Sequence, residues 1–110
     1  MPKHIYIAGP YTGGDVAVNV GKAVGVGDAL AESGAVPFIP HLSHFWHLLW
    51  PHEWEFWLTQ DLAWLAKCDA LLRLPGASPG AEREIAEAER LGLPVFRTVT
   101  ALMYWLAQQE

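Results

Sequence analysis

The sequence of 110 residues has few basic side chains and almost no cysteine. Seven Lys and Arg stand against twelve Asp and Glu, giving a formal net charge of −5, which argues against polymeric nucleic acid as a partner. The single cysteine, Cys68, excludes an internal disulfide and fits a reducing compartment. No apolar run approaches the roughly 20 residues that span a membrane, and the first residues lack the apolar stretch of a signal peptide. We therefore expect a cytoplasmic protein without a membrane partner.

Two nucleotide-binding fingerprints are also missing. The glycines of residues 9–14 (GPYTGG) do not spell GxGxxG, and nothing in the chain resembles a P-loop lysine. This argues against a dinucleotide-dependent dehydrogenase and against an NTPase, and we expect no cofactor. The turn does allow close backbone approach to a ligand at Gly9, Gly13 and Gly14, and it adds the hydroxyl of Thr12.

Apolar residues, in contrast, are abundant. Hydrophobic residues make up 52% of the chain, with six tryptophans, and this length suits one domain over residues 1–110 with one core. Tryptophan is concentrated between Trp46 and Trp64 beyond what one core of this size hides. This surplus predicts a homodimer or a higher homo-oligomer.

Strand patterns alternate with helix patterns along the chain. We expect strands at residues 3–8, 35–39, 69–74 and 94–97. We expect helices at 15–33 and 53–67 and two more that begin near residues 78 and 100, with an irregular segment or short helix at 41–52. This order predicts an α/β fold, a Rossmann-like or flavodoxin-like parallel sheet of four to five strands with helices on both faces. Ligands bind such sheets at the carboxyl ends of the strands, which here gathers residues 9–14, 41–44 and 76–80.

Asp61 is an acidic residue on an apolar helix face. It shares the stripe of the helix at 53–67 with Trp57, Leu58 and Leu65. A carboxylate there costs free energy unless it is paired or functional. Perturbed carboxylates gather at active sites, so we interpret Asp61 as a functional acid; the alternative is a structural aspartate bonded to a loop or a tyrosine.

A second carboxylate follows a helix start. Ser78 is typical of an N-cap and Pro79 of the first helical position. Ala81 replaces the Glu or Gln of a capping box, which leaves N–H groups of the first turn free for an anion such as phosphate. Glu84 has Ala81 and Ala88 as helix neighbours, so we expect it to point towards protein or ligand; the alternative is a half-exposed surface glutamate.

Tyr6 and the histidines complete the set of candidates. Tyr6 faces the opposite side of its strand from its neighbours, either towards a site or under a helix. His41, His44 and His47 recur every three residues and raise a zinc hypothesis, but residues so spaced do not share one helix face and no cysteine pair accompanies them, so we expect no metal. The segment is richer in aromatic residues, which predicts a wall that stacks a nucleobase, or else core or dimer packing.

Three segments carry a family resemblance: IYIAGPYTGG at 5–14, QDLAWLAKCDALL at 60–72 and SPGAEREIAEA at 78–88. They resemble the nucleoside 2-deoxyribosyltransferase superfamily, in particular its 2′-deoxynucleoside 5′-monophosphate N-glycosidase branch with its uncharacterised phage and bacterial relatives. The resemblance implies a catalytic site of Tyr6, Asp61 and Glu84. It also implies that the loop Ser78, with Gly80 beside it, helps to hold a phosphate. We add His41 and His44 to the expected substrate contacts, because they lie at the same sheet edge.

The implied reaction is a retaining displacement on a small nucleoside or nucleotide. Glu84, ionised by its helix N-terminus, would attack C1′ of the sugar, Asp61 would protonate the departing base, and Tyr6 would orient Glu84. Water would then give hydrolysis and a second base would give transfer. Thr12 replaces the arginine of the N-glycosidases, which weakens or moves phosphate recognition, and the family often borrows C-terminal residues from a neighbouring subunit. The alternatives are a non-catalytic nucleotide sensor on this fold, a metal-dependent protein and a purely structural module.

Overall fold

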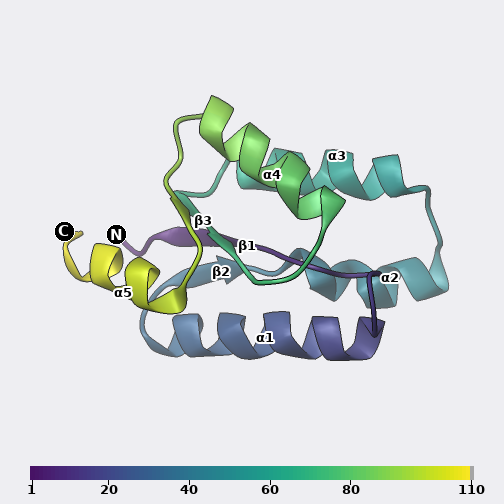
Figure 1. The fold of residues 1–110 in the computed structure, drawn as a ribbon, viewed down its shortest axis with the longest axis horizontal. Helices are drawn as coiled ribbons and strands as arrows, with labels where there is room; N and C mark the ends of the chain where they lie inside the picture. The colour runs from purple at the N-terminus through teal and green to yellow at the C-terminus, as the bar shows by residue number, and fades with distance from the viewer. Residues whose placement is uncertain (110) are drawn as a thin grey trace.

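Four parallel strands form the centre of the protein in a computed structural model that describes residues 1–109 (Figure 1). The strands are β1 (His4–Ala8), β2 (Val36–Phe38), β3 (Ala70–Arg73) and β4 (Val95–Phe96), in the order β2-β1-β3-β4. In the register of the sheet, Tyr6 of β1 lies between Phe38 and Leu71. The expected α/β fold with a parallel sheet is confirmed, with four strands in the described residues.

Helices cover both faces of this sheet. They are α1 (Val16–Glu32), α2 (Ser43–Leu49), α3 (Trp54–Leu65), α4 (Pro79–Arg90) and α5 (Val99–Ala107). Helices α1 and α5 pack on one face and α3 and α4 on the other (Figure 1). The segment at 41–52, expected to be irregular or a short helix, forms a 3-10 turn, η1 (Pro40–Leu42), followed by α2.

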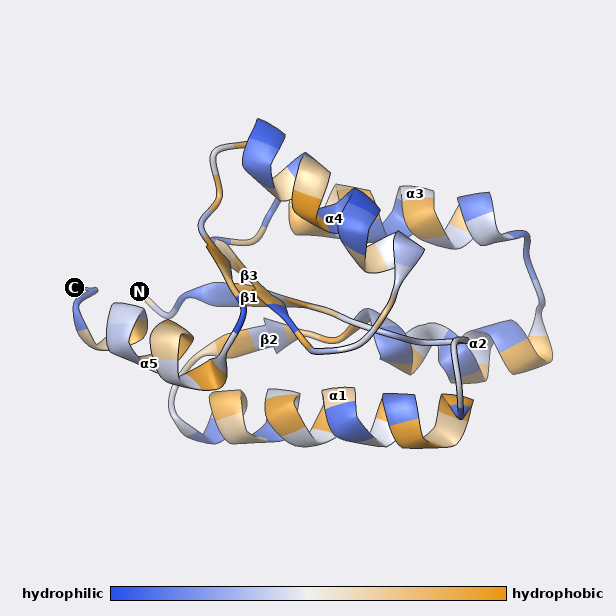
Figure 2. Ribbon diagram, viewed as in Figure 1, coloured by the Kyte–Doolittle hydropathy of each residue, from blue (hydrophilic) through white to orange (hydrophobic). Residues whose placement is uncertain are grey.

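The alternation of side chains along β1 explains the two cores. Ile5 and Ile7 point to the face covered by α1 and α5, whereas Tyr6 and Ala8 point to the face covered by α3 and α4. Helices α1 and α4 alternate between hydrophilic and hydrophobic colours along their length (Figure 2), as expected of helices that bury one side. Tyr6 is therefore directed towards the helices that carry the two candidate carboxyl groups.

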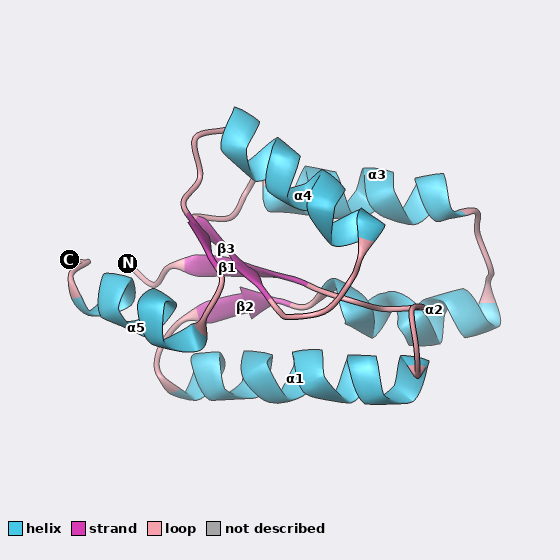
Figure 3. Cartoon of the chain, in the orientation of Figure 1, coloured by secondary structure: helices cyan, strands magenta, loops and turns pink. Residues whose placement is uncertain are grey.

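Two predicted helix starts are confirmed, and the second one sets where α4 begins. Asp15 caps α1 by accepting a hydrogen bond from the Val18 N–H. Ser78 caps α4, where its Oγ accepts from the Ala81 N–H at 3.1 Å, and Pro79 is the first helical residue. The loops that follow β1 and β3 leave the sheet at the same end (Figure 3). The start of α4 therefore lies beside the loop that follows β1. In residues 1–109 we find no helix with the length and apolarity to cross a membrane.

Candidate active site

A cavity of about 560 Å³ opens at the carboxyl ends of the strands. Its walls come from the loop after β1, the segment after β2, and the loop after β3 together with the start of α4. Side chains of α2, α3 and the α2–α3 connection close the remaining side. This is the edge at which parallel α/β sheets place their ligands, and the volume is typical of small-molecule sites.

Tyr6 and Glu84 form a buried pair at this cavity. Tyr6 is 0% exposed, and its phenolic O–H donates to Oε2 of Glu84, which is 6% exposed and lines the cavity. The Tyr6 ring stacks on Phe38 with centroids 5.5 Å apart, which holds the hydroxyl in place. Burial, followed by the nearby Glu84 and Asp61 carboxyl groups, raises the pKa of Tyr6 well above its ordinary value. Tyr6 therefore remains a neutral hydrogen-bond donor.

Asp61 lies on α3 and lines the same cavity. Burial raises the pKa of Asp61 to about 7. Burial also raises the pKa of Glu84 to about 8, against the lowering effect of the Tyr6 hydrogen bond and the Arg73 charge, while the Asp61 charge adds to the rise. Both carboxyl groups therefore keep their protons to a higher pH than exposed carboxyl groups do, and because they line one cavity their titrations are coupled.

The expectation that a helix N-terminus keeps Glu84 ionised is wrong. Glu84 is the sixth residue of α4, beyond the first turn to which the helix dipole is confined. Loss of water around its carboxyl group has the larger effect and favours the neutral form. In the free protein, burial thus favours the protonated form of Glu84.

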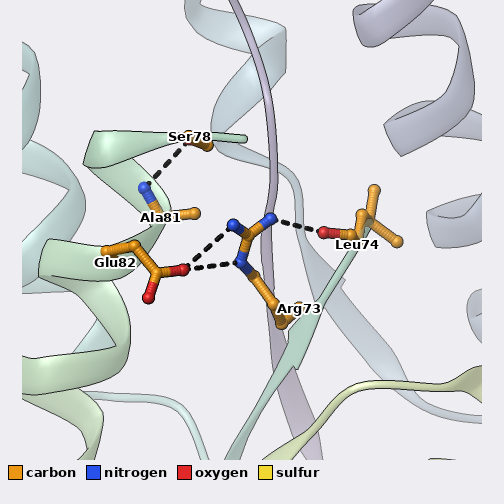
Figure 4. A network of polar contacts seen from close by, with 5 residues as sticks. All are labelled: Arg73, Leu74, Ser78, Ala81 and Glu82. Atoms are coloured by element: carbon orange, nitrogen blue, oxygen red, sulfur yellow. Dashed lines mark hydrogen bonds and ion pairs between the residues drawn. The ribbon is translucent and has the colours of Figure 1, made fainter. Parts of the chain in front are cut away.

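Arg73 is a buried cation at the end of β3, and it joins this strand to α4 (Figure 4). Its Nε and Nη2 donate to one carboxylate oxygen of Glu82 at 3.2 and 3.0 Å, and its Nη1 donates to the Leu74 carbonyl at 2.5 Å. Its charge lowers the pKa of Glu84. Our sequence interpretation gave Arg73 no role, although a charged residue within a run of buried strand residues is a signal.

The cavity gathers most of the substrate contacts expected from the sequence. Six of the eight residues line it: Gly9, Thr12, Gly13, His41, Ser78 and Gly80. The other two, Gly14 and His44, do not. Gly14 has a left-handed backbone with φ of +88° and leads into α1, and His44 lies behind Tyr11, with 2.5 Å between the tyrosine oxygen and Nδ1. Tyr11 itself lines the cavity.

The prediction that aromatic residues of the segment 41–52 form a wall for a nucleobase is wrong for this cavity, because Phe45, Trp46 and Trp50 are exposed and do not line it. The wall is formed instead by two histidines and by residues of α3: His47, His52, Trp54, Trp57 and Leu58. The three histidines of the zinc hypothesis have separate hydrogen-bond partners. His41 bonds to the Pro10 carbonyl, His44 bonds to the Tyr11 hydroxyl, and His47 accepts from the indole N–H of Trp57. Nowhere in residues 1–109 do three His, Cys, Asp or Glu side chains come together as a metal site would need.

The fold and the site together define an α/β protein with a ligand cavity at its strand ends and two carboxyl groups of raised pKa in its wall. Residues 3–98 match a family model described as a domain of unknown function, DUF7768, and the chain belongs to this family.

A solved structure shares the fold. It is the 2-deoxyribosyltransferase of the psychrotolerant bacterium Bacillus psychrosaccharolyticus, which is similar with a TM-score of 0.61 and 24% identity, covering 84% of this chain and 69% of that one. That enzyme is described as a biocatalyst for the synthesis of antiviral and antitumoral nucleosides. At this level of identity the likeness establishes a common fold. A comparison with curated proteins finds no match.

Proposed function

We propose that this protein cleaves or transfers the N-glycosidic bond of a nucleoside or its 5′-monophosphate through a glycosyl ester on Glu84. The observation that carries the proposal is the Tyr6 hydroxyl, fully buried, donating to Glu84 in the wall of a cavity that Asp61 also lines. Two carboxyl groups of raised pKa at one cavity are what a displacement with a nucleophile and an acid needs. The fold shared with a 2-deoxyribosyltransferase supports the same class of substrate.

The chemistry uses one proton shared by two carboxyl groups. In the productive state the proton is on Asp61, and Glu84 is ionised, a charge that the Tyr6 hydrogen bond and Arg73 both favour. Glu84 attacks C1′ of the sugar, the electrons of the C1′–N bond go to the base, and Asp61 gives its proton to the departing nitrogen. Ionised Asp61 then takes a proton from water or from a second base as that nucleophile attacks C1′, the ester breaks, and the Glu84 carboxylate and the protonated Asp61 are regenerated.

The cavity favours an uncharged nucleoside over a 5′-monophosphate. No lysine or arginine from residues 1–109 lines it, and two acidic side chains do. Thr12 stands in the first turn, where a guanidinium would have paired with a phosphate. Ser78 and Gly80, at the start of α4, are the remaining candidates for holding a phosphate.

The test is release of free base, followed by chromatography, from the four deoxynucleosides, their 5′-monophosphates and the matching ribonucleosides. Wild type should release base and Glu84→Gln should not, and addition of an acceptor base separates transfer from hydrolysis. Glu89→Gln is the matched control, since Glu89 is exposed on the same helix. Equal rates in wild type and Glu84→Gln would refute the proposed nucleophile.

A second function is favoured by one observation. Glu84 is buried, and this burial raises its pKa, which disfavours the ionised form needed for attack and suits a site that binds a nucleoside or nucleotide without reacting with it. Such a sensor would bind its ligand with an affinity that Glu84→Ala leaves intact, and it would release no base from any member of the panel.

A further inference from the structure

The ring of His47 is held in one tautomer by its neighbours. The indole Nε1–H of Trp57 lies 2.9 Å from Nδ1 of His47, and the backbone N–H of His52 lies 3.2 Å from the same atom. Both partners are hydrogen-bond donors and neither is an acceptor. Nδ1 must therefore be unprotonated, and a neutral His47 carries its hydrogen on Nε2.

This tautomer leaves one polar group for a ligand. His47 lines the cavity, and its Nε2–H has no hydrogen-bond partner within residues 1–109. Nε2–H stays a hydrogen-bond donor, because the N–H groups of Trp57 and His52 beside Nδ1 disfavour the tautomer with its hydrogen on Nδ1. A ligand atom that meets it must be an acceptor, such as a carbonyl oxygen or an unprotonated ring nitrogen.

The surroundings of His47 indicate which part of a ligand lies there. Trp54 and Trp57 line the same wall, and the guanidinium of Arg83 lies 5.6 Å from the centre of the Trp54 ring, where it restrains that side chain. Asp61, which would protonate the departing base, is one helical turn beyond Trp57 on α3. Flat aromatic faces beside a proton donor suit a nucleobase better than a sugar.

We propose that His47 is a specificity-determining residue whose Nε2–H donates a hydrogen bond to an acceptor atom on the nucleobase. The inference rests on the proposed function for its substrate class. Nothing in the proposed reaction requires His47 to take or give a proton. Its loss should therefore weaken base binding and leave the chemical step largely unchanged.

Two substitutions at position 47 separate this role from a structural one. In His47→Asn the amide oxygen takes the place of Nδ1 and still accepts from Trp57 and His52, but the donor towards the cavity is gone. In His47→Gln the amide nitrogen reaches towards the place of Nε2 and keeps a donor. We expect His47→Asn to raise KM for base release by about 3- to 10-fold with little change in kcat, and His47→Gln to recover most of the loss.

Binding and spectroscopy make failure of the inference distinct from failure of the proposed function. Nucleoside affinity is measured by calorimetry for wild type and both variants, and the tautomer is read from ¹⁵N imidazole resonances, with His47 assigned by its loss in His47→Gln. An unprotonated Nδ1 together with weaker nucleoside binding by His47→Asn supports the role of His47, even if no base is released. Absence of base release would reject only the proposed reaction. A protonated Nδ1, equal affinities of wild type and His47→Asn, or no nucleoside binding at all would overturn the inference.

Discussion

At the scale of single residues, the hydroxyl of Tyr6 has one acceptor and cannot reach water. Its hydrogen bond to Glu84 is the contact that lowers the pKa of that carboxyl group most strongly. Removing the hydroxyl should shift the sharing of the proton between Glu84 and Asp61. The effect should therefore appear in the pH dependence of base release.

We expect wild type to show a bell-shaped profile of kcat/KM against pH, with limbs near the pKa values of about 7 and about 8 that the carboxyl pair presents. In Tyr6→Phe the pKa of Glu84 rises, so the alkaline limb should move to higher pH. The maximum should fall by about 10- to 100-fold, because less of the enzyme has Glu84 ionised and Asp61 protonated.

The control for Tyr6→Phe is Tyr104→Phe, since Tyr104 is 70% exposed and outside the cavity lining. Phenylalanine keeps the stacking on Phe38, so both variants should retain the far-ultraviolet circular dichroism of wild type. An unchanged profile in Tyr6→Phe would contradict the role given to the hydroxyl.

The raised pKa of Asp61 predicts that the free energy of unfolding depends on pH. The folded protein holds its proton up to a pKa of about 7, whereas the ordinary value is 3.8. The unfolded chain releases this proton first as pH rises, so the free energy of unfolding falls between these two values. Asp61→Asn removes the free-energy cost of burying an ionised carboxylate. The variant should be more stable than wild type by on the order of 1 to 4 kcal/mol at about pH 8, with almost no difference at about pH 4.

The measurement is urea unfolding at the two pH values, with Asp28→Asn, exposed on α1, as the control. If the stability difference between Asp61→Asn and wild type is the same at both pH values, Asp61 does not carry a raised pKa.

At the scale of helices and strands, sequence patterns located the elements well. Local rules sufficed for α4, where Ser78 and Pro79 mark the start, and for β1, where alternation separates Tyr6 from its neighbours. The family resemblance and the helical pattern pointed to Asp61 and Glu84, and the fold brings both to one cavity.

The protonation of Glu84 and the contacts of Arg73 and His47 were not predicted from the sequence. The first depends on how much water the folded chain excludes from the carboxyl group. Arg73 meets Glu82 across a strand and a helix, and His47 meets Trp57 across two helices, so neither contact follows from spacing along a single element. Tertiary packing decides such contacts.

The Arg73 contact predicts a role in holding α4 against β3. Arg73→Met removes the guanidinium that binds Glu82 and the Leu74 carbonyl, and it leaves that carbonyl without this donor. We expect a loss of about 1 to 3 kcal/mol in the free energy of unfolding, and lower activity because Glu84 lies on the helix that shifts. Chemical denaturation measures the first effect and base release the second.

The matched control is Arg90→Met, since Arg90 is 68% exposed and pairs with Glu87 within one helix. Such surface pairs contribute about 0 to 1 kcal/mol. Equal losses in the two variants would mean that the Arg73 contact does not hold α4 in place.

At the scale of the whole molecule, large apolar side chains are exposed on η1, on α2, on α3 and between these helices. The exposed residues of this surface are Leu42, Phe45, Trp46, Leu48, Leu49, Trp50, Trp54 and Trp64. Many large apolar side chains exposed on neighbouring segments are typical of an interface, and we propose that a second copy of the chain covers them.

Analytical ultracentrifugation at micromolar concentration should therefore give twice the mass of one chain. A double variant, Leu49→Gln with Trp50→Gln, should move the mass towards one chain, because these side chains are 70% and 66% exposed in the single chain. Wild type that sediments only as a monomer would contradict the proposed dimer.

In the proposed reaction Glu84 becomes covalently attached to the sugar, and mass spectrometry can detect this ester. Wild type and Glu84→Gln are mixed with the deoxynucleoside that gives the fastest base release, quenched in acid within one turnover, and examined by mass spectrometry of the intact chain and of its peptides. We expect an added glycosyl group on the wild-type peptide that contains Glu84, and none on Glu84→Gln. Base release by wild type with the glycosyl group on another residue, or an adduct that persists in Glu84→Gln, would refute attack by Glu84.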